Sequence, residues 1–239
     1  RPRTKTAMMN SHNQTRLISK PIAGQHGSSF RDPSGFIFRR EGRLLRQINQ
    51  RYAPDYDLLM SSGLYDRLLK TGQIIPHREV EDAGAEPALA YKVIQPDLVP
   101  FISYPYEWSF SQLKDGALTT LSIQKRALKA RMSLKDSSAY NIQFLNGKPI
   151  LIDTLSFEKY REGEPWVAYR QFCQHFLAPL ALMAHTDIRL GQLLRVYIDG
   201  IPLDLASRLL PWPTRLNFGL LTHIHLHARA QQRYADREI

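Results

Sequence analysis

Alternating apolar and polar residues in the first half of the chain predict a small sheet. Residues 35–40 and 43–48 are rich in aromatic and branched side chains and flank Glu41-Gly42, which predicts two strands joined by a tight turn. Two more β-rich runs, 88–94 and 101–104, are each bounded by prolines and predict two further strands.

Helical spacing of apolar residues appears first between residues 55 and 70. The spacing is three and four residues, and Gly72 and Pro76 follow it, which predicts one amphipathic helix. A longer helix is predicted from Ser109 to about Arg131, because Ser109 and Gln112 form a capping-box pattern before a helical repeat. From residue 165 onward the pattern is mostly helical, over about 165–184, 187–197, 202–210 and 217–235.

A β-hairpin is predicted between the long helix and the helical C-terminal part. Residues 140–145 and 148–153 flank Asn146-Gly147, a turn pair that strongly favours a two-residue hairpin loop. In this register Asn141 and Asp153 lie one step apart at the open end of the hairpin. Neighbouring strand positions face opposite sides, so the two side chains meet only where the strand ends or bends.

Composition indicates a globular protein and excludes collagen-like and wholly disordered chains. The 239 residues are 43% hydrophobic and 10% aromatic, enough apolar surface to offset chain entropy. The longest nearly apolar run, 176–184, is far shorter than the about 20 residues of a membrane-spanning helix. The single cysteine, Cys173, cannot form an internal disulfide and suits a reducing compartment. We therefore expect a cytoplasmic protein without a membrane span.

The net charge of +10 is concentrated at the N-terminus. Half of the excess lies in the first twenty residues, at Arg1, Arg3, Lys5, Arg16 and Lys20, and no acid precedes Asp32. We expect residues 1–27 to form a disordered basic tail, with an organellar transit peptide as the alternative. The rest of the chain shows no basic helix face and no zinc-finger spacing, so we expect no specific nucleic-acid binding.

Residues 134–155 carry the side-chain types that phosphoryl transfer needs. Asp136 precedes Asn141 by five residues, and Asp153 follows Asn141 by twelve. Phosphoryl transfer uses an acid near the acceptor hydroxyl and oxygen ligands that hold magnesium on the phosphates, because catalysis is mostly positioning and charge neutralisation. Lys135 is a candidate for neutralising the transferred phosphate, with an ordinary loop lysine as the alternative.

This stretch resembles the catalytic and metal-binding loops of protein kinases and of the aminoglycoside phosphotransferase-like family. The resemblance implies that Asp136 is the catalytic base, that Asn141 and Asp153 are metal ligands, and that Mg²⁺ and ATP are the cofactors. It also implies an α+β, two-lobed kinase-like fold. Its small N-terminal β-sheet lobe with one helix would span 28–106, and its larger helical lobe would span 107–239 with the hairpin 134–155 at the cleft.

The same resemblance suggests the nucleotide contacts. Arg46 on the first hairpin, and Asp66 on the helix that follows, stand where that fold has its phosphate-binding lysine and the acidic partner of that lysine. A solvated strand arginine is the alternative for Arg46. Tyr104 and Tyr106 are candidates to line an adenine pocket between the lobes, and packing is an equally good interpretation.

A second resemblance covers nearly all of the chain from Gly27 onward. The segments that carry it are Phe30–Phe36, Leu59–Tyr65, Ser103–Phe110, Ile152–Glu158 and Trp166–Phe176. They are similar to the N-terminal region of bacterial proteins labelled SAM-dependent methyltransferases, including a nodulation-type group. In that family the methyltransferase domain lies downstream. This implies a second hypothesis, a non-catalytic scaffold or substrate-binding module that serves such a domain. The acceptor, small molecule or protein, stays open.

Overall fold

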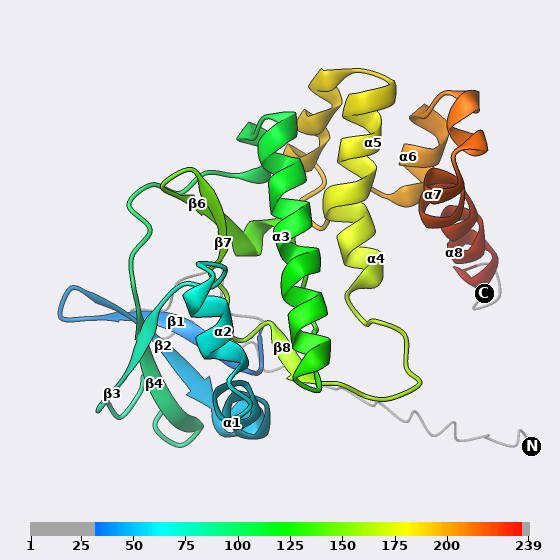
Figure 1. Ribbon diagram of the computed structural model, residues 1–239. Coiled ribbons are helices and arrows are strands. Elements are labelled where there is room, and N and C mark those ends of the chain that lie inside the picture. Colours follow the sequence, from blue (N-terminus) through cyan, green and yellow to red (C-terminus); the bar gives the residue numbers. More distant parts are fainter. Residues whose placement is uncertain (1–31, 236–239) are drawn as a thin grey trace, which may run out of the picture.

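A four-stranded antiparallel sheet forms the N-terminal part of the structure (Figure 1). The computed structural model describes residues 32–235, so the predicted tail 1–27 lies outside the described residues. The strand order is β1-β2-β4-β3, with bounds Gly35–Arg40, Arg43–Asn49, Ala90–Pro96 and His77–Val80. The first predicted hairpin and the strand after residue 88 are therefore confirmed.

The fourth strand of the sheet is not the predicted one. Residues 101–104 form no strand, and Phe101 is 75% exposed. The flanking Pro100 and Pro105 lack the N–H that a ladder needs, and the Ser103 N–H donates to the Gln143 side chain instead (3.0 Å). The fourth strand is β3, whose largely polar sequence carries no strand pattern.

The predicted helix over 55–70 is two helices. They are α1, Ala53–Ser61, and α2, Leu64–Lys70. Gly63 lies between them with a φ of 67°, a left-handed conformation that ends a helix and that only glycine adopts easily. The expectation of one helix beside the sheet is therefore wrong.

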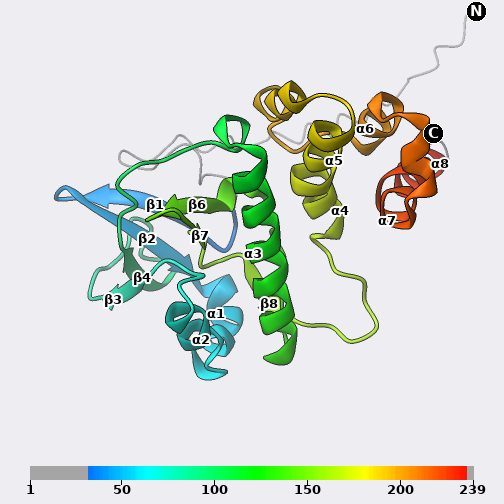
Figure 2. The ribbon, with the colours of Figure 1, turned by 45° about the horizontal axis from the view of Figure 1, so that its top comes forward.

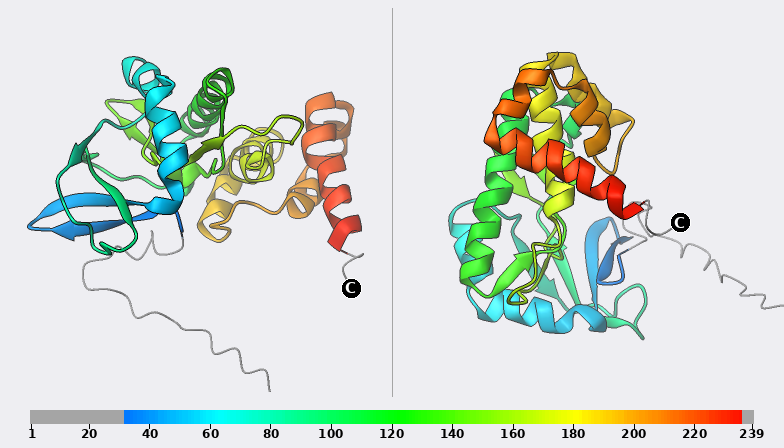
Figure 3. Two further views of the ribbon diagram at one scale, coloured as in Figure 1. Left: turned by 90° about the horizontal axis from the view of Figure 1, so that it is seen from below. Right: turned by 90° about the vertical axis from the view of Figure 1, so that its right-hand side faces the viewer.

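The long helix α3, Phe110–Lys129, stands between the sheet and the remaining helices (Figures 1 and 2). The capping box of Ser109 and Gln112 is formed as predicted. Beyond α3 the elements are α4 Tyr169–Phe172, η5 Cys173–Leu177, α5 Ala178–His185, η6 Ile188–Arg195, α6 Leu203–Leu209, η7 Trp212–Leu216, α7 Phe218–Leu220, η8 Leu221–Leu226 and α8 His227–Ala235. Figure 3 shows α6 to α8 on the side of α4 and α5 away from the sheet. The mainly helical C-terminal part is thus confirmed.

Two small strand pairs lie between the sheet and α3. β5, Met132–Leu134, pairs with β8, Phe157–Lys159, and β6, Ile142–Leu145, pairs with β7, Lys148–Leu151. The predicted turn connects β6 to β7. The Ile152 N–H donates to the Asn141 carbonyl (2.8 Å), which sets the expected register at the open end of the hairpin.

The main core packs α3 against α2, the strand pairs and the C-terminal helices. In it, Gln124 of α3 is a buried polar side chain that ties the helix to β5. Its Oε1 accepts from the Leu134 N–H (2.7 Å) and its Nε2 donates to Ser133 Oγ (3.0 Å). This pair of bonds fixes the strand that leads into residues 135–141. Among residues 32–235, no helix is long and apolar enough to cross a membrane.

We expect Gln124→Met to destabilise the fold, because the substitution leaves the buried Leu134 N–H without its acceptor. The expected loss is about 1–3 kcal/mol of unfolding free energy, measured by urea denaturation. Lys125→Met, on an exposed position of the same helix, is the control and should change stability little. Equal effects of the two substitutions would contradict the role assigned to Gln124.

Candidate functional site

One cavity of about 810 Å³ collects most of the residues singled out in the sequence. Five of the predicted site residues line it: Arg46, Lys135, Asp136, Asn141 and Asp153. They come from β2, from the segment after β5, from η4 (Ala139–Asn141) and from the segment after β7. The cavity therefore lies where the sheet, the β6–β7 hairpin and the start of the C-terminal helices meet.

Arg46 enters the cavity from the sheet and is almost completely buried. Its Nη1 lies 2.5 Å from Asp153 Oδ1, and its Nη2 lies 4.0 Å from Asp32 Oδ2. The Arg46 side chain is 9% exposed and that of Asp153 15% exposed. The interpretation of Arg46 as a solvated strand arginine is therefore wrong. The guanidinium is not fully engaged by these carboxylates, because its Nε has no hydrogen-bond partner among the described residues.

Asp153 and Asn141 lie together, connected by Ser156. Asp153 Oδ2 accepts from Ser156 Oγ (2.7 Å), and Ser156 Oγ accepts from Asn141 Nδ2 (3.3 Å). Asp153 Oδ1 also accepts from the Leu155 N–H (3.0 Å), which holds the segment after β7 in a turn. Because β7 ends at Leu151, Asp153 is free of the strand alternation that would have turned it away from Asn141.

Among the described residues, Lys135 is the second cation that lines the cavity, beside Arg46. Its Nζ donates to Ser34 Oγ (2.5 Å) and lies 4.6 Å from the centre of the Tyr52 ring. Its backbone N–H donates to the Ser156 carbonyl (2.8 Å). Lys135 and Arg46 thus both contact the turn Asp32–Ser34 that precedes β1.

Asp136 lies in a segment held by several hydrogen bonds. Its Oδ1 accepts from the Ser138 N–H (2.9 Å), and the next residue, Ser137, donates its N–H to Gln171 Oε1 (2.6 Å) and its Oγ to the Ala168 carbonyl (2.8 Å). Asp136 Oδ2 has no hydrogen-bond partner among the described residues. This leaves one carboxylate oxygen available to a ligand in the cavity.

His175 and Asp199 are among the cavity residues that the sequence did not predict as site residues. His175 lies in η5 and is 2% exposed, and burial lowers its pKa to about 4, partly offset by the Asp136 and Asp199 carboxylates. Gly200, with a φ of 93°, allows residues 198–200 to pack on η5, because a Cβ there would lie 2.6 Å from Gln174 Cβ. Short-range sequence patterns give no signal for such a long-range contact.

Tyr104, Tyr106 and Asp66 do not line this cavity. Tyr104 stacks on Tyr106 (5.5 Å between ring centres), and Tyr104 also contacts the ring of Tyr140 (6.5 Å), which does line it. Asp66 is exposed on α2. The expectation that Asp66 is the acidic partner of Arg46 is wrong, because α2 is a separate short helix and Arg46 pairs with Asp153 and Asp32.

The residues present fit a magnesium ion only in part. Asn141 and Asp153 offer hard oxygen donors at one place, as Mg²⁺ prefers. Within the described part of the chain, no group of three or more His, Cys, Asp or Glu side chains could hold a metal ion. Asn141 and Asp153 would therefore supply only part of the ligands of such an ion.

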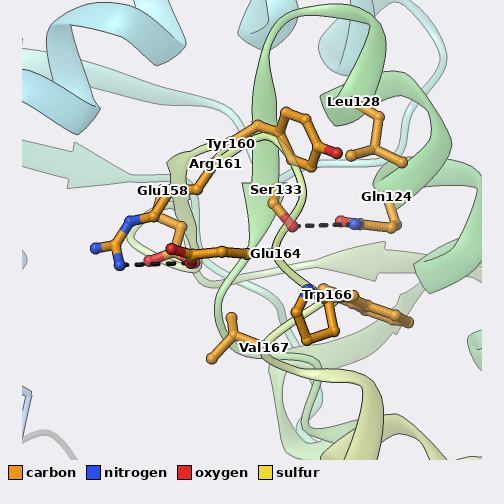
Figure 4. A pocket seen from close by; sticks show the side chains of 10 residues that line it. Gln124, Leu128, Ser133, Glu158, Tyr160, Arg161, Glu164, Trp166 and Val167 are labelled. Carbon is orange, nitrogen blue, oxygen red and sulfur yellow. Dashed lines mark hydrogen bonds and ion pairs between the residues drawn. The ribbon is translucent and has the colours of Figure 1, made fainter.

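A smaller cavity of about 220 Å³ lies beside α3 and β8 (Figure 4). Four of its polar side chains form two pairs: Gln124 bonds Ser133 (3.0 Å), and Arg161 pairs with Glu164 (3.5 Å). Trp166 donates its Nε1–H to the Leu134 carbonyl (2.7 Å). None of the predicted site residues lines it, so the larger cavity is the candidate site.

Comparison with known proteins finds a relative that this chain matches over part of its length. The chain is similar to nodulation protein NoeA of Rhizobium meliloti (strain 1021), with 35% identity over 222 residues. The match covers 90% of this chain and 45% of the relative, so the chain spans just under half of the relative's length. No family model matches the chain. The likeness agrees with the nodulation-type part of the resemblance seen in the sequence, and the kinase-like fold stays a prediction.

The buried, neutral His175 makes stability depend on pH. Its folded-state pKa of about 4 lies below the ordinary value of 6.5, so its contribution is complete above about pH 6.5 and is lost as the pH falls through about 4. The loss is of the order of 3 kcal/mol, at 1.36 kcal/mol per pKa unit.

We expect His175→Gln to reduce the slope of unfolding free energy against pH between about pH 4 and 6.5, measured by urea denaturation at a series of pH values. Burial also lowers the pKa of His77 to about 4, so the variant with both histidines replaced should show a still flatter profile. An unchanged slope in His175→Gln would contradict the neutral, buried state of this ring.

Proposed function

We propose that this chain is a phosphotransferase domain that binds Mg-ATP in the larger cavity and transfers the γ-phosphoryl group to a hydroxyl acceptor. The observation that supports the proposal best is the convergence of Arg46, Asn141, Asp153 and Asp136 on one cavity, from segments up to 107 residues apart. Each has the chemistry that the reaction needs: a phosphate-binding cation, two oxygen ligands for the metal, and a carboxylate beside them.

In this proposal the sheet with α1 and α2 is the smaller lobe of a kinase-like fold, and α3 with the C-terminal helices is the larger lobe. The β6–β7 hairpin, which lies near both the sheet and α3 (Figure 1), is then at the junction of the two proposed lobes. The Arg46–Asp153 ion pair spans this junction.

The residues then have distinct roles. Arg46 and Lys135 bind the phosphates, Asn141 and Asp153 hold the metal ion, and Asp136 orients the acceptor. Mg²⁺, when bound, neutralises charge on the phosphate oxygens. In the transfer, the acceptor oxygen bonds to the γ-phosphorus, the bond to the bridging oxygen breaks, and ADP leaves with that electron pair. The hydroxyl proton passes to the Asp136 carboxylate.

A second candidate function is a non-catalytic binding module for a methyltransferase domain. The observation that favours it is the Arg46–Asp153 ion pair itself, because it occupies both the phosphate-binding cation and a metal ligand. In that case the ion pair is structural, and a ligand that binds in the cavity is not phosphorylated. The name of the relative suggests that either function serves a nodulation-related protein.

A cytoplasmic location is part of the proposal. The structure supports it through Cys173, which is buried as a free thiol and so is compatible with a reducing compartment.

Mg-ATP should stabilise the folded chain, because it binds only the assembled cavity. At 100 times its Kd the expected gain is about 2.7 kcal/mol, read as a rise in melting temperature. Mg²⁺ alone should give little or no rise, since Asn141 and Asp153 supply only part of a coordination sphere. A folded protein that no mixture of nucleotide and divalent metal stabilises would overturn the proposal.

Two aspartate variants separate the proposed roles. Asp153→Asn removes a charge from the metal site and should weaken Mg-ATP binding itself, measured by calorimetric titration. Asp136→Asn keeps an oxygen to accept the Ser138 N–H, so binding should persist while turnover falls roughly 100-fold or more. Melting curves of both variants are the control for folding. Mg-ATP binding without turnover in the unsubstituted protein would favour the non-catalytic module.

A further inference from the structure

The long helix α3 carries a row of exposed leucines. Leu118, Leu121 and Leu128 are 57%, 41% and 42% exposed, whereas the apolar side chains on its core-facing side are almost completely buried. Figures 1 and 2 show α3 along its whole length at the front of the molecule. The described residues 32–235 therefore leave an apolar strip of this helix uncovered.

The exposed leucines have the spacing of a coiled-coil seam. Positions 118, 121, 125 and 128 follow one another at intervals of three, four and three residues, which makes them the a and d positions of a heptad repeat. Lys125 is the one polar residue among these four. Single exposed leucines need no partner, but a row at this spacing is the pattern by which two helices pack side by side.

Two charged residues flank this row on one side. Asp115 and Lys129 occupy e positions of the same heptad repeat, one near each end of α3. Both side chains are exposed, and neither forms an ion pair with another described residue. In helix pairs the e positions lie beside the seam, and their ion pairs set the choice and the orientation of the partner.

Lys125 disfavours a parallel pair of these helices. In a parallel pair each seam position meets itself, so the two Lys125 ammonium groups would face each other. In an antiparallel pair an a position meets a d position. Leu118 then packs on Leu128 of the second copy, and Leu121 packs on the aliphatic part of Lys125 of the second copy, whose ammonium group reaches solvent.

The antiparallel register also matches the flanking charges. Asp115 of one copy lies within about one helical turn of Lys129 of the other, and twofold symmetry repeats this pair. Sliding the helices by one heptad in one direction brings Lys114 opposite Lys125, and sliding them in the other direction leaves Leu118 without a partner. One register therefore satisfies both the apolar row and the charges.

We propose that α3 binds a second copy of this chain in an antiparallel homodimer, with Leu118, Leu121 and Leu128 at the core of the interface. The homodimer does not depend on the proposed function, because none of these residues lines the larger cavity. A single pair of helices gives a small interface, so the dimer is a weak one that dissociates on dilution.

The first test measures the association of the chain by sedimentation velocity, from low micromolar to submillimolar concentration. We expect a reversible equilibrium between monomer and dimer. Leu118→Glu places a charge in the seam and should raise the dimer dissociation constant by about ten-fold or more. Leu216→Glu is the matched control, because Leu216 is 73% exposed on η7, outside α3, and its substitution should leave the equilibrium unchanged.

Several results of this measurement would contradict the homodimer. A monomer at every concentration overturns the proposal, and so does a dimer that Leu118→Glu leaves unchanged. A dimer that Leu216→Glu weakens as much as Leu118→Glu does, or more, would assign the contact to the exposed apolar residues of η7 and would also overturn it.

The second test reverses the flanking charges. Asp115→Lys and Lys129→Asp each place like charges beside each other, so each should weaken the dimer about ten-fold at low salt. The double variant restores opposite charges and should regain the affinity of the unsubstituted chain. An equimolar mixture of the two single variants should form a heterodimer, because each of its two pairs then joins a lysine to an aspartate.

Melting curves of the charge variants are the control for folding. Both positions are exposed in the monomer, so the single variants should melt close to the unsubstituted chain. Single variants that dimerise as well as the unsubstituted chain, or a double variant that stays as weak as the single ones, would show that the antiparallel register is wrong and would overturn the proposal.

Discussion

The buried ion pair between Arg46 and Asp153 is the contact on which the candidate site depends. It joins the second strand of the sheet to the segment after the β6–β7 hairpin, with both side chains largely shielded from solvent. Removing one partner of such a pair leaves an unpaired buried charge, at a cost of about 3–5 kcal/mol. The position of the sheet relative to the hairpin, and with it the shape of the cavity, is therefore tied to these two charges.

Asp153 also organises the residues around it. The same carboxylate accepts hydrogen bonds from the Leu155 N–H and from Ser156 Oγ, and Ser156 in turn meets Asn141. The Ser156 carbonyl accepts a hydrogen bond from the Lys135 N–H, which extends the β5–β8 ladder by one residue to the cavity wall. One short segment thus sets the positions of three candidate site residues at once.

The sequence could predict the parts of this site that follow from local rules. The Asn146-Gly147 turn sets the register of its hairpin, and the capping box of Ser109 starts α3 where expected. These signals act over a few residues, so they depend little on tertiary contacts. They predict that Asn141 and Asp153 lie one step apart at the open end of the hairpin, whereas the meeting of their side chains depends on β7 ending at Leu151.

Tertiary contacts decided the remaining features. His175 and Asp199 line the cavity from the helical C-terminal part, where the apolar periodicity predicts which side chains are packed and not which polar side chains meet. Asp32 lines it from a segment without regular structure. Asp66 was misplaced because Gly63 breaks the helix, and a break changes which side chains face the sheet. Residues 101–104 have strand-like side chains, but their flanking prolines remove the hydrogen bonds that a strand needs.

The Arg46–Asp153 pair also bears on how metal and nucleotide would bind together in the proposed function. A magnesium ion alone would have to compete with the guanidinium for Asp153, and a phosphate alone would have to compete with Asp153 for Arg46. When metal and phosphate bind together, both charges would gain a new partner. Asp153 would bind the metal in place of Arg46, and Arg46 would bind a phosphate oxygen in place of Asp153. No buried charge is left unpaired in that exchange. In the proposed function this ion pair would therefore favour joint binding of metal and phosphate over binding of either alone.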